Sequence, residues 1–467
     1  MLEEIRTQIR TAFQKSGQPE IIERTFLQQV EYVSSGKSAF ISSAEIEPVL
    51  NPTRLEELSQ FEKAGSDALA GLVVCKLNGG LGTSMGLEKA KSLLSVRDGY
   101  SFLDIMIEQV KWERKRSGAS LPFLCMNSFR TERDTLDVLK PDFNGSTLPL
   151  SMLQHQVPKI DSQTFLPAQC AEDPELEWCP PGHGDLYPVL ISSGVLKKAL
   201  SLGFEYLFVS NSDNLGATIS LPLLGYLSEK NIPFLMEVAE RTVSDRKGGH
   251  LARTKDGQLI LRERAQVAPG DEEDFQDYRK YTSFNTNSLW LNLRALDALL
   301  EEHGQVLPLP VIRNEKPLNP REPSSQRVLQ LETAMGSAIH LFPGAEAVLV
   351  PRSRFAPVKT TEDLMRIRSD LFTLSEDFQL RSVLDKEAIP ITLDPRFYGK
   401  IDDFEARFPD GIPQLRNATS LTIEGDVQFG SHAVCRGEVL VKNAGTQQQK
   451  ILPDTVLEGE VVLFGKS

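Results

Sequence analysis

Short apolar runs alternate with helically spaced apolar positions along the chain from residue 70 onward. Four runs have the continuous apolar character of buried strands: LVVCKL at 72–77, FLCMN at 123–127, YLFVSN at 206–211 and FLMEVAE at 234–240. Helices are expected between them, and Asp256-Gly257 predicts a hairpin turn. The alternation predicts an α/β fold with a largely parallel sheet and helices on both faces. Ligands of such sheets lie beyond the carboxyl ends of the strands.

The first 66 residues have a different pattern. Apolar residues recur at helical spacing over residues 1–35, and Gly17 and Pro19 divide this stretch into two helices. Residues 44–66 are expected to be a linker that leads into a further helix. Pro52 can begin that helix, with Asn51 as its N-cap.

The C-terminal tail repeats apolar residues every six positions in two registers. One register contains Leu421, Val427, Ala433 and Val439, the other contains Ile423, Phe429, Cys435 and Val441, and the spacing returns at Ile451, Leu457 and Leu463. An ordinary alternating strand would explain one register but not both. The repeat therefore predicts a short β-helical domain from about residue 400 to the end.

Composition narrows the class of protein. The 467 residues carry a net charge of −13 without a lysine- or arginine-rich run, so a nucleic-acid or anionic-membrane partner is not expected. No signal sequence and no apolar stretch of membrane-spanning length is evident, which favours a cytoplasmic protein. The five cysteines are scattered. Cys75 and Cys125 lie inside apolar runs and are expected to be small buried residues rather than catalytic groups or metal ligands.

A glycine-rich segment follows the first strand of the sheet. Gly79, Gly80 and Gly82 come directly after the run at 72–77, and Lys91 follows nine residues later. Glycines bring backbone N–H groups close to an anion, and lysine adds mobile positive charge. The pattern matches neither of the two commonest nucleotide-binding fingerprints. A tight turn is the alternative interpretation, and a phosphate site is favoured.

Polar residues after two further strands suggest metal and substrate contacts. Asp213 follows the run at 206–211, where a carboxylate is costly unless it meets a cation, so Mg²⁺ held together with substrate phosphates is one interpretation and a turn cap is another. His183 is flanked by glycines, which are expected to leave its ring accessible. Asn285 and Asn287 alternate in a strand-like segment that disfavours asparagine, which points to a ligand role.

Longer motifs carry a family resemblance. The segment KLNGGLGTSMGLEKAKS resembles the signature of the eukaryotic-type UTP–glucose-1-phosphate uridylyltransferases, or UDP-glucose pyrophosphorylases. Its AKS departs from the commoner GPKS of that family but keeps the lysine. Further blocks match in the family's order: PPGHGDLY at 180–187, VSNSDNLGAT at 209–218, DRKGGHL at 245–251, FNTNSLW at 284–290 and VPRSRFAPVKTTEDL at 350–364.

The resemblance implies a fold and a domain plan. It implies a nucleotidyltransferase core, Rossmann-like and GT-A-like, with a mixed sheet, N-terminal helices and a C-terminal left-handed β-helix domain. The expected units are an N-terminal helical region at 1–45, a catalytic domain at 46–385, and a linker with the β-helix domain at 386–467. The resemblance also leaves room for a homo-oligomer formed through the C-terminal domain, whose strands could stack edge to edge.

The resemblance further implies an activity. An enzyme of this family transfers UMP from UTP to α-D-glucose 1-phosphate and gives UDP-glucose and pyrophosphate by Mg²⁺-assisted in-line displacement. The protein aligns two polyanions and neutralises their charge. Two alternatives stay open: a broad-specificity UDP-sugar pyrophosphorylase, and a catalytically inactive homologue that binds a sugar nucleotide. Neither the direction of the reaction in the cell nor the oligomeric state follows from the sequence.

Matching the family's motifs position by position implies the site residues. Lys91 and Lys359 would be the two phosphate-contacting lysines, and Asp213 the catalytic Mg²⁺ ligand. His183, after Gly182, would donate a hydrogen bond to the sugar phosphate. Uracil would contact Leu77, Asn78, Gly79, Gly80 and Gln154, with Gln156 as the rival amide. The hexose end of the site would comprise Asn211, Ser212, Gly249, Glu263, Phe284, Asn285 and Asn287.

Overall fold

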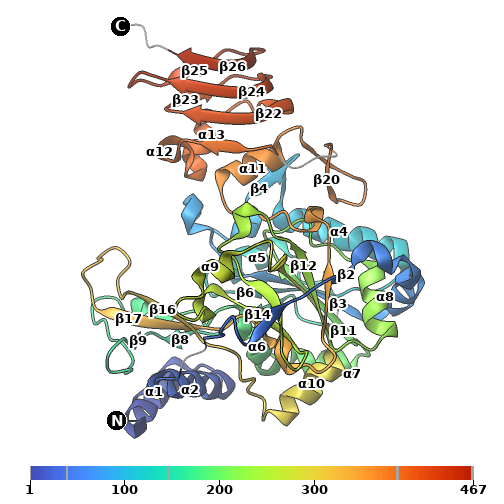
Figure 1. The fold of residues 1–467 in the computed structure, drawn as a ribbon, viewed down its shortest axis with the longest axis vertical. Helices are drawn as coiled ribbons and strands as arrows, with labels where there is room; N and C mark the ends of the chain where they lie inside the picture. The colour runs from blue at the N-terminus through green and yellow to red at the C-terminus, as the bar shows by residue number, and fades with distance from the viewer. Residues whose placement is uncertain (1, 38–39, 146, 385–388, 464–467) are drawn as a thin grey trace.

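The computed structural model describes residues 2–37, 40–145, 147–384 and 389–463. A large mixed sheet of 11 strands lies at its centre, with helices on both faces (Figure 1). Its main path runs β2 (Thr53–Arg54), β18 (Glu346–Leu349), β12 (Phe234–Glu240), β15 (Ser283–Asn292), β11 (Tyr206–Asn211), β3 (Leu72–Asn78), β6 (Phe123–Asn127) and β7 (Ser151–Leu153). The four strand-like runs of the sequence therefore are strands of one sheet.

The prediction of a largely parallel sheet needs a correction. The pairs β11–β3, β3–β6, β6–β7, β12–β18 and β18–β2 are parallel, but β15 is antiparallel to both of its neighbours, β11 and β12. The chain between β12 and β15 forms the hairpin β13 (His250–Thr254) and β14 (Leu259–Arg262), then the short helix α9 (Glu272–Gln276). This connection contains a hairpin and only a five-residue helix, with no long crossover helix of the kind that usually joins parallel strands, and β15 returns antiparallel to β12.

The central strands of the sheet contribute side chains to two cores. Val74 and Phe208 point to the core under helices α4 (Phe102–Ser117) and α8 (Leu221–Glu229), whereas Cys75 and Val209 point to the core under α6 (Leu186–Ser192), α7 (Val195–Ser201) and α10 (Leu293–Glu302). Alternation of side chains across a strand explains why these runs are apolar throughout. Cys75 and Cys125 are fully buried, as expected.

The two N-terminal helices are confirmed as α1 (Leu2–Ser16) and α2 (Glu20–Ser34), which pack over the strands of a side layer (Figure 1). That layer contains β8 (Val157–Pro158), β9 (Ile160–Asp161), β10 (Trp178–Cys179), β16 (Ile312–Pro317) and β17 (Arg327–Glu332). The expected helix at Pro52 is wrong, because β1 (Ile46–Pro48) and β2 add strands to the central sheet. The helical turns begin later, with the 3₁₀ segment Leu55–Phe61 and α3 (Glu62–Ala68), and Asn51 adopts a positive φ of 52° instead of capping them.

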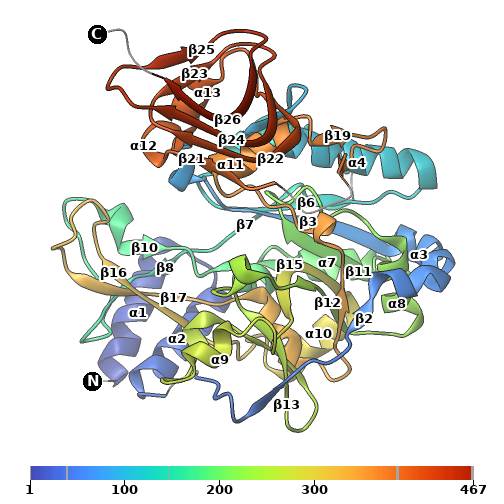
Figure 2. The ribbon, with the colours of Figure 1, turned by 45° about the horizontal axis from the view of Figure 1, so that its top comes forward.

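Parallel strands stack into a tapering layered unit at the C-terminus (Figures 1 and 2). One sheet runs β21 (Ile391–Leu393), β22 (Gln414–Glu424), β24 (Val434–Asn443) and β26 (Val456–Leu463), and a second pairs β23 (Val427–Phe429) with β25 (Gln449–Ile451). Both registers of the six-residue repeat are buried from Leu421 to Val441, and Leu421 pairs with Val439. The repeat thus marks parallel stacked strands, whereas a left-handed β-helix stays a prediction.

The C-terminal strands share their core with the central sheet. One continuous apolar cluster runs from β3 through α4 and α11 (Thr361–Arg368) to α12 (Pro395–Tyr398), α13 (Ile401–Arg407) and the stacked strands. The smaller elements are α5 (Glu132–Val138), the hairpin β4 (Ser95–Arg97) with β5 (Tyr100–Ser101), and the hairpin β19 (Phe372–Leu374) with β20 (Leu380–Ser382). Within the described ranges, no helix combines the length and apolarity that crossing a membrane requires.

Candidate active site

The glycine-rich segment closes into a loop after β3. Gly82 adopts a left-handed φ of 69°, and the backbone N–H of Lys91 donates a hydrogen bond of 3.1 Å to the carbonyl of Gly80. This bond returns the chain to the end of the strand and begins a 3₁₀ turn at Lys91–Leu93. The predicted loop therefore exists, and it presents Lys91 at the carboxyl edge of the sheet.

Lys91 meets Asp213 across the end of β11. Its Nζ lies 2.7 Å from Asp213 Oδ2, and the two side chains are only 13% and 18% exposed. The chain from Pro351 onward reaches the same place, because the Val358 N–H donates a 3.1 Å hydrogen bond to the Asp213 carbonyl. The next residue, Lys359, is exposed. The Lys91–Asp213 ion pair and the main chain just before Lys359 therefore come together at one edge of the sheet.

Gln154 lies between two glycine turns. Its backbone N–H bonds to the Asn127 carbonyl at 2.7 Å, its Nε2 donates to the Gly182 carbonyl at 2.9 Å, and a Cβ on Gly79 would come within 3.0 Å of its Oε1. The rival Gln156 instead donates its backbone N–H to Gln18 of the N-terminal helical region. Of the two amides, Gln154 is the one beside the glycine loop.

The end of β3 offers backbone rather than side-chain groups. The Asn78 side chain is buried and donates to Asn127 Oδ1 and Thr135 Oγ1, both at 2.8 Å. The Leu77 carbonyl accepts a 3.0 Å hydrogen bond from the Ser212 N–H, which joins this strand to the turn after Asn211. Any contact of Asn78 with a base therefore involves its main chain, in agreement with the expected backbone recognition of uracil.

His183 is held as a neutral hydrogen-bond donor. Its Nδ1 accepts a 3.1 Å hydrogen bond from the Met335 N–H, which leaves the proton of a neutral ring on Nε2. The ring is partly buried rather than open as its glycine neighbours suggested, and this burial lowers the pKa of His183 to about 4. At neutral pH the Nε2–H can donate to an anionic oxygen without adding charge.

Glu263 and the asparagines of β15 form the remaining part of the site. A Cβ on Gly249 would lie 2.4 Å from Glu263 Oε2, so a larger residue there would displace the Glu263 carboxylate, and burial raises the pKa of Glu263. The pairing of β12 with β15 jumps from Ser288 to Asn285, which leaves a bulge in β15 where Asn287 has a φ of 59°. The bulge lets Asn285 Nδ2 donate to Asn287 Oδ1 at 2.9 Å.

Two further contacts join this group to the others. Gly336, next to Met335, is so close to Asn285 that a Cβ there would lie 2.7 Å from Asn285 Nδ2. Phe284 packs edge-on against Phe355, four residues before Lys359, with ring centroids 4.9 Å apart. The histidine, the asparagines and the lysine loop are thus linked through residues that the sequence motifs alone did not single out.

Comparisons with known proteins identify the family to which the chain is similar. Residues 23–436 match the family described as UTP–glucose-1-phosphate uridylyltransferase. The protein of that name from Hordeum vulgare is 41% identical over 395 residues, covering 83% of this chain and 81% of its own, and that from Saccharomyces cerevisiae is 39% identical over 407 residues, covering 84% and 78%. A mutant UDP-glucose pyrophosphorylase from Leishmania major, solved in complex with UDP-glucose, superposes with a TM-score of 0.89 at 41% identity and 99% coverage of both chains.

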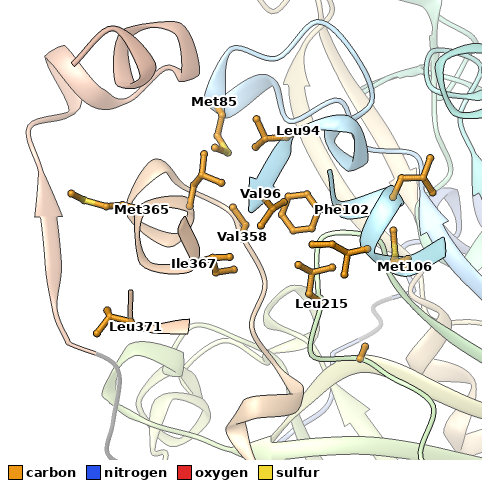
Figure 3. Close-up of a cluster of buried hydrophobic side chains, with 14 of the residues drawn as sticks. Met85, Leu94, Val96, Phe102, Met106, Leu215, Val358, Met365, Ile367 and Leu371 are labelled. Carbon is orange, nitrogen blue, oxygen red and sulfur yellow. The ribbon is translucent and has the colours of Figure 1, made fainter. Parts of the chain in front are cut away.

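The chain belongs to the UTP–glucose-1-phosphate uridylyltransferase family. The large mixed α/β sheet is in keeping with the family's solved structures. The glycine loop of this uridylyltransferase family member, its Asp213 turn and its Lys359 loop also share one apolar cluster, in which Met85 and Leu94 lie near Leu215 and Val358 (Figure 3). The three loops are therefore anchored on one hydrophobic support.

The donor set limits the kind of metal site that this family member can form. Among the residues that the structure describes, no group of three or more His, Cys, Asp or Glu side chains could hold a metal ion. Asp213 offers one carboxylate, which is paired with Lys91. One carboxylate with substrate phosphates is an arrangement typical of Mg²⁺, which prefers oxygen ligands and keeps several waters. Asp213 thus fits an ion shared with a nucleotide and not an all-protein metal site.

Acid is expected to destabilise this uridylyltransferase family member through His250, the residue after Gly249. His250 is fully buried and stacks on Tyr281 at 3.8 Å, and burial lowers its pKa to about 3. An unfolded histidine titrates near pH 6.5, so between about pH 6.5 and pH 3 the unfolded chain binds a proton that the folded protein excludes. The contribution of His250 to stability is lost as the pH falls, by about 2 kcal/mol between pH 7 and pH 5.

His250→Phe keeps the stacked ring and removes the titration. Urea unfolding at about pH 7 and pH 5 measures how much the free energy of unfolding falls between the two pH values. This fall should be about 2 kcal/mol smaller in His250→Phe than in the wild type. An equal difference in both proteins would show that His250 already carries a proton in the fold at pH 5.

Proposed function

We propose that this protein transfers UMP from UTP to α-D-glucose 1-phosphate and releases pyrophosphate, forming UDP-glucose. The carrying observation is the Lys91–Asp213 ion pair at the carboxyl edge of the sheet, to which a main-chain hydrogen bond joins the segment just before Lys359. The named activity of the barley and yeast relatives, and the UDP-glucose bound by the Leishmania major protein, support the same substrates. The alternative of a binding protein without catalysis is disfavoured because all three groups are retained together.

The proposed chemistry is an in-line displacement at the α-phosphorus of UTP. An oxygen of the sugar phosphate forms the new P–O bond while the bond to pyrophosphate breaks, so no covalent enzyme intermediate is needed. Lys91 and Lys359 neutralise the charge that develops on the bridging oxygen. Mg²⁺, bound by Asp213 and phosphate oxygens, would supply further charge neutralisation and orient the triphosphate.

The remaining assignments follow the same geometry. The backbone from Leu77 to Gly80 and the amide of Gln154 bind uracil, with edge-on donors and acceptors. The Nε2–H of His183, in its turn after Gly182, donates to the sugar phosphate. The hexose hydroxyls meet the polar set Asn211, Ser212, Gly249, Glu263, Asn285 and Asn287, with Phe284 beside them. Glu263, held next to the Gly249 backbone, accepts from a hydroxyl group.

A pyrophosphate-release assay tests the proposal. UTP with glucose 1-phosphate is expected to give turnover, and ATP, CTP and GTP are expected to give little, because the loop after β3 presents fixed backbone donors and acceptors. Galactose 1-phosphate separates the two enzymatic candidates: comparable turnover with both sugars would indicate a broad-specificity UDP-sugar pyrophosphorylase. No pyrophosphate release with UTP and any sugar 1-phosphate would contradict an enzymatic function.

The domain plan and cellular setting belong to the same proposal. We infer an N-terminal helical region at 1–45, a catalytic domain at 46–385 and a C-terminal unit at 386–467 that is a left-handed β-helix. Support comes from the parallel pairing of β22 with β24 and of β24 with β26. The outer edge of β26 is a surface through which two copies could associate. A cytoplasmic location is in keeping with nucleotide and sugar-phosphate substrates.

A further inference from the structure

The Asp213 turn and the Lys359 loop are fastened together by one buried amide. Asn214 is 1% exposed; its Nδ2 donates to the Arg354 carbonyl at 3.0 Å, and its Oδ1 accepts from the Ala356 N–H at 2.9 Å. The same Oδ1 accepts from the Gly216 N–H at 3.2 Å. Both ends of this amide therefore bind main-chain groups, of the segment at 354–356 and of its own turn.

We call the hydrogen bonds that join Asn214 to Arg354, Ala356 and Gly216 the Asn214 clasp. The contacts around this clasp make it rigid. A Cβ on Gly216 would lie 2.3 Å from the Ser353 carbonyl oxygen, so the two segments approach as closely as backbone allows. Below them the Arg354 guanidinium forms two 2.7 Å bonds to the fully buried Glu237 carboxylate and a 2.8 Å bond to the Thr218 carbonyl. A buried, doubly bonded ion pair of this kind fixes direction as well as distance.

Lys359 itself is held weakly by comparison. It is exposed, and its backbone N–H donates to the side chain of Asp363 in the first turn of α11. Its position relative to Asp213 therefore depends on the main chain before it, which Asn214 binds at residues 354 and 356 and the Asp213 carbonyl binds at Val358. We propose that Asn214 is a positioning residue that sets Lys359 against the Asp213–Lys91 pair; the kinetic part of this inference rests on the proposed function.

A double-mutant cycle distinguishes positioning from general destabilisation. Asn214→Ala is expected to lower kcat by about 10- to 100-fold, with KM for UTP changed by about threefold or less, because a displacement of about 1 Å is enough for such a loss. In a Lys359→Ala background the same change should cost no more than about twofold, since the group it positions is gone. Full multiplication of the two losses would overturn the inference.

Limited trypsin digestion tests the clasp without relying on catalysis. Arg352 and Lys359 are exposed cleavage sites on either side of the bound segment, and Asn214→Ala should speed cleavage there by about tenfold. Asn144→Ala is the matched control: this buried amide likewise binds main chain, at Phe123 by 2.8 and 2.9 Å, but at the amino end of β6. It should leave kcat and cleavage at these two sites unchanged. Unaltered cleavage in Asn214→Ala would overturn the inference even if the enzyme is active. If the wild type has no activity but Asn214→Ala is cleaved faster than the wild type, only the proposed function is rejected.

Discussion

Replacing Lys91 with alanine is expected to lower kcat by about 10²–10³, and Lys359→Ala should have a loss of similar size. Charge develops on the bridging oxygen as pyrophosphate leaves, and a charge-assisted contact that tightens at that moment is worth about 3–4 kcal/mol. A contact equally strong in the ground state would mainly raise KM instead. Lys91 is suited to a contact that tightens in the transition state, because Asp213 holds its Nζ at 2.7 Å at the carboxyl edge of the sheet.

The double variant and a neighbouring lysine make the test specific. Lys91→Ala with Lys359→Ala should lose less than the product of the two single losses, because both charges act on one phosphate chain. Lys89→Ala is the control, since Lys89 is exposed and two residues away on the same loop. Steady-state kinetics with UTP and glucose 1-phosphate measure all four variants and the wild type. Equal rates for Lys89→Ala, Lys91→Ala and wild type would show that the glycine loop is only a turn and not a phosphate site.

Local patterns were sufficient for the elements with strong internal signals. The run at 72–77 and the glycines after it predict β3 and its loop, because a short apolar run and residues without side chains leave few alternatives. Gly17 and Pro19 likewise separate α1 from α2. The tail repeat predicts buried positions correctly from Leu421 to Val441, since a period shared by two registers requires stacked strands.

Elements whose partners lie far along the chain could not be predicted in this way. Ile46–Pro48 has no strand-like pattern, and it becomes β1 because it pairs with Arg253 and its neighbours in β13. Pro52 suggested a helix start, but the next residues pair with β18 instead. The direction of β15 depends on the hairpin before it and not on its own residues. In each case tertiary pairing overrides the local preference.

The site shows the same division. Its motifs could be matched one by one, but the contact between Lys91 and Asp213 joins residues 122 positions apart and follows only from the fold. Arg354 could have been a surface charge or a structural partner from its sequence context, and it is buried against Glu237. Asn214, the last residue of SNSDN, has no predicted role from the motif. The signal that could have singled it out is an amide directly after a carboxylate at a strand end, where turn carbonyls need partners.

Asp213→Asn is expected to lower turnover by about 10²–10³ while UTP affinity stays within about tenfold. The substitution keeps the shape and an acceptor for Lys91 Nζ but removes the negative charge that would hold Mg²⁺ against the phosphates. Loss of one negative charge beside a triphosphate also reduces repulsion, so binding need not suffer. Calorimetry with UTP and steady-state kinetics at several Mg²⁺ concentrations measure the two effects separately.

A matched ion pair elsewhere controls for the loss of a carboxylate as such. Asp426 bonds Arg407 Nε at 2.9 Å in the C-terminal unit with an exposure of 20%, close to the 18% of Asp213, so Asp426→Asn should leave turnover unchanged. If Asp213 acts through the metal, the Asp213→Asn variant should need more Mg²⁺ for half-maximal rate, and excess EDTA should stop the wild-type enzyme. Undiminished wild-type turnover in EDTA would leave Asp213 with a single role, the orientation of Lys91, because its 2.7 Å ion pair does not depend on a metal.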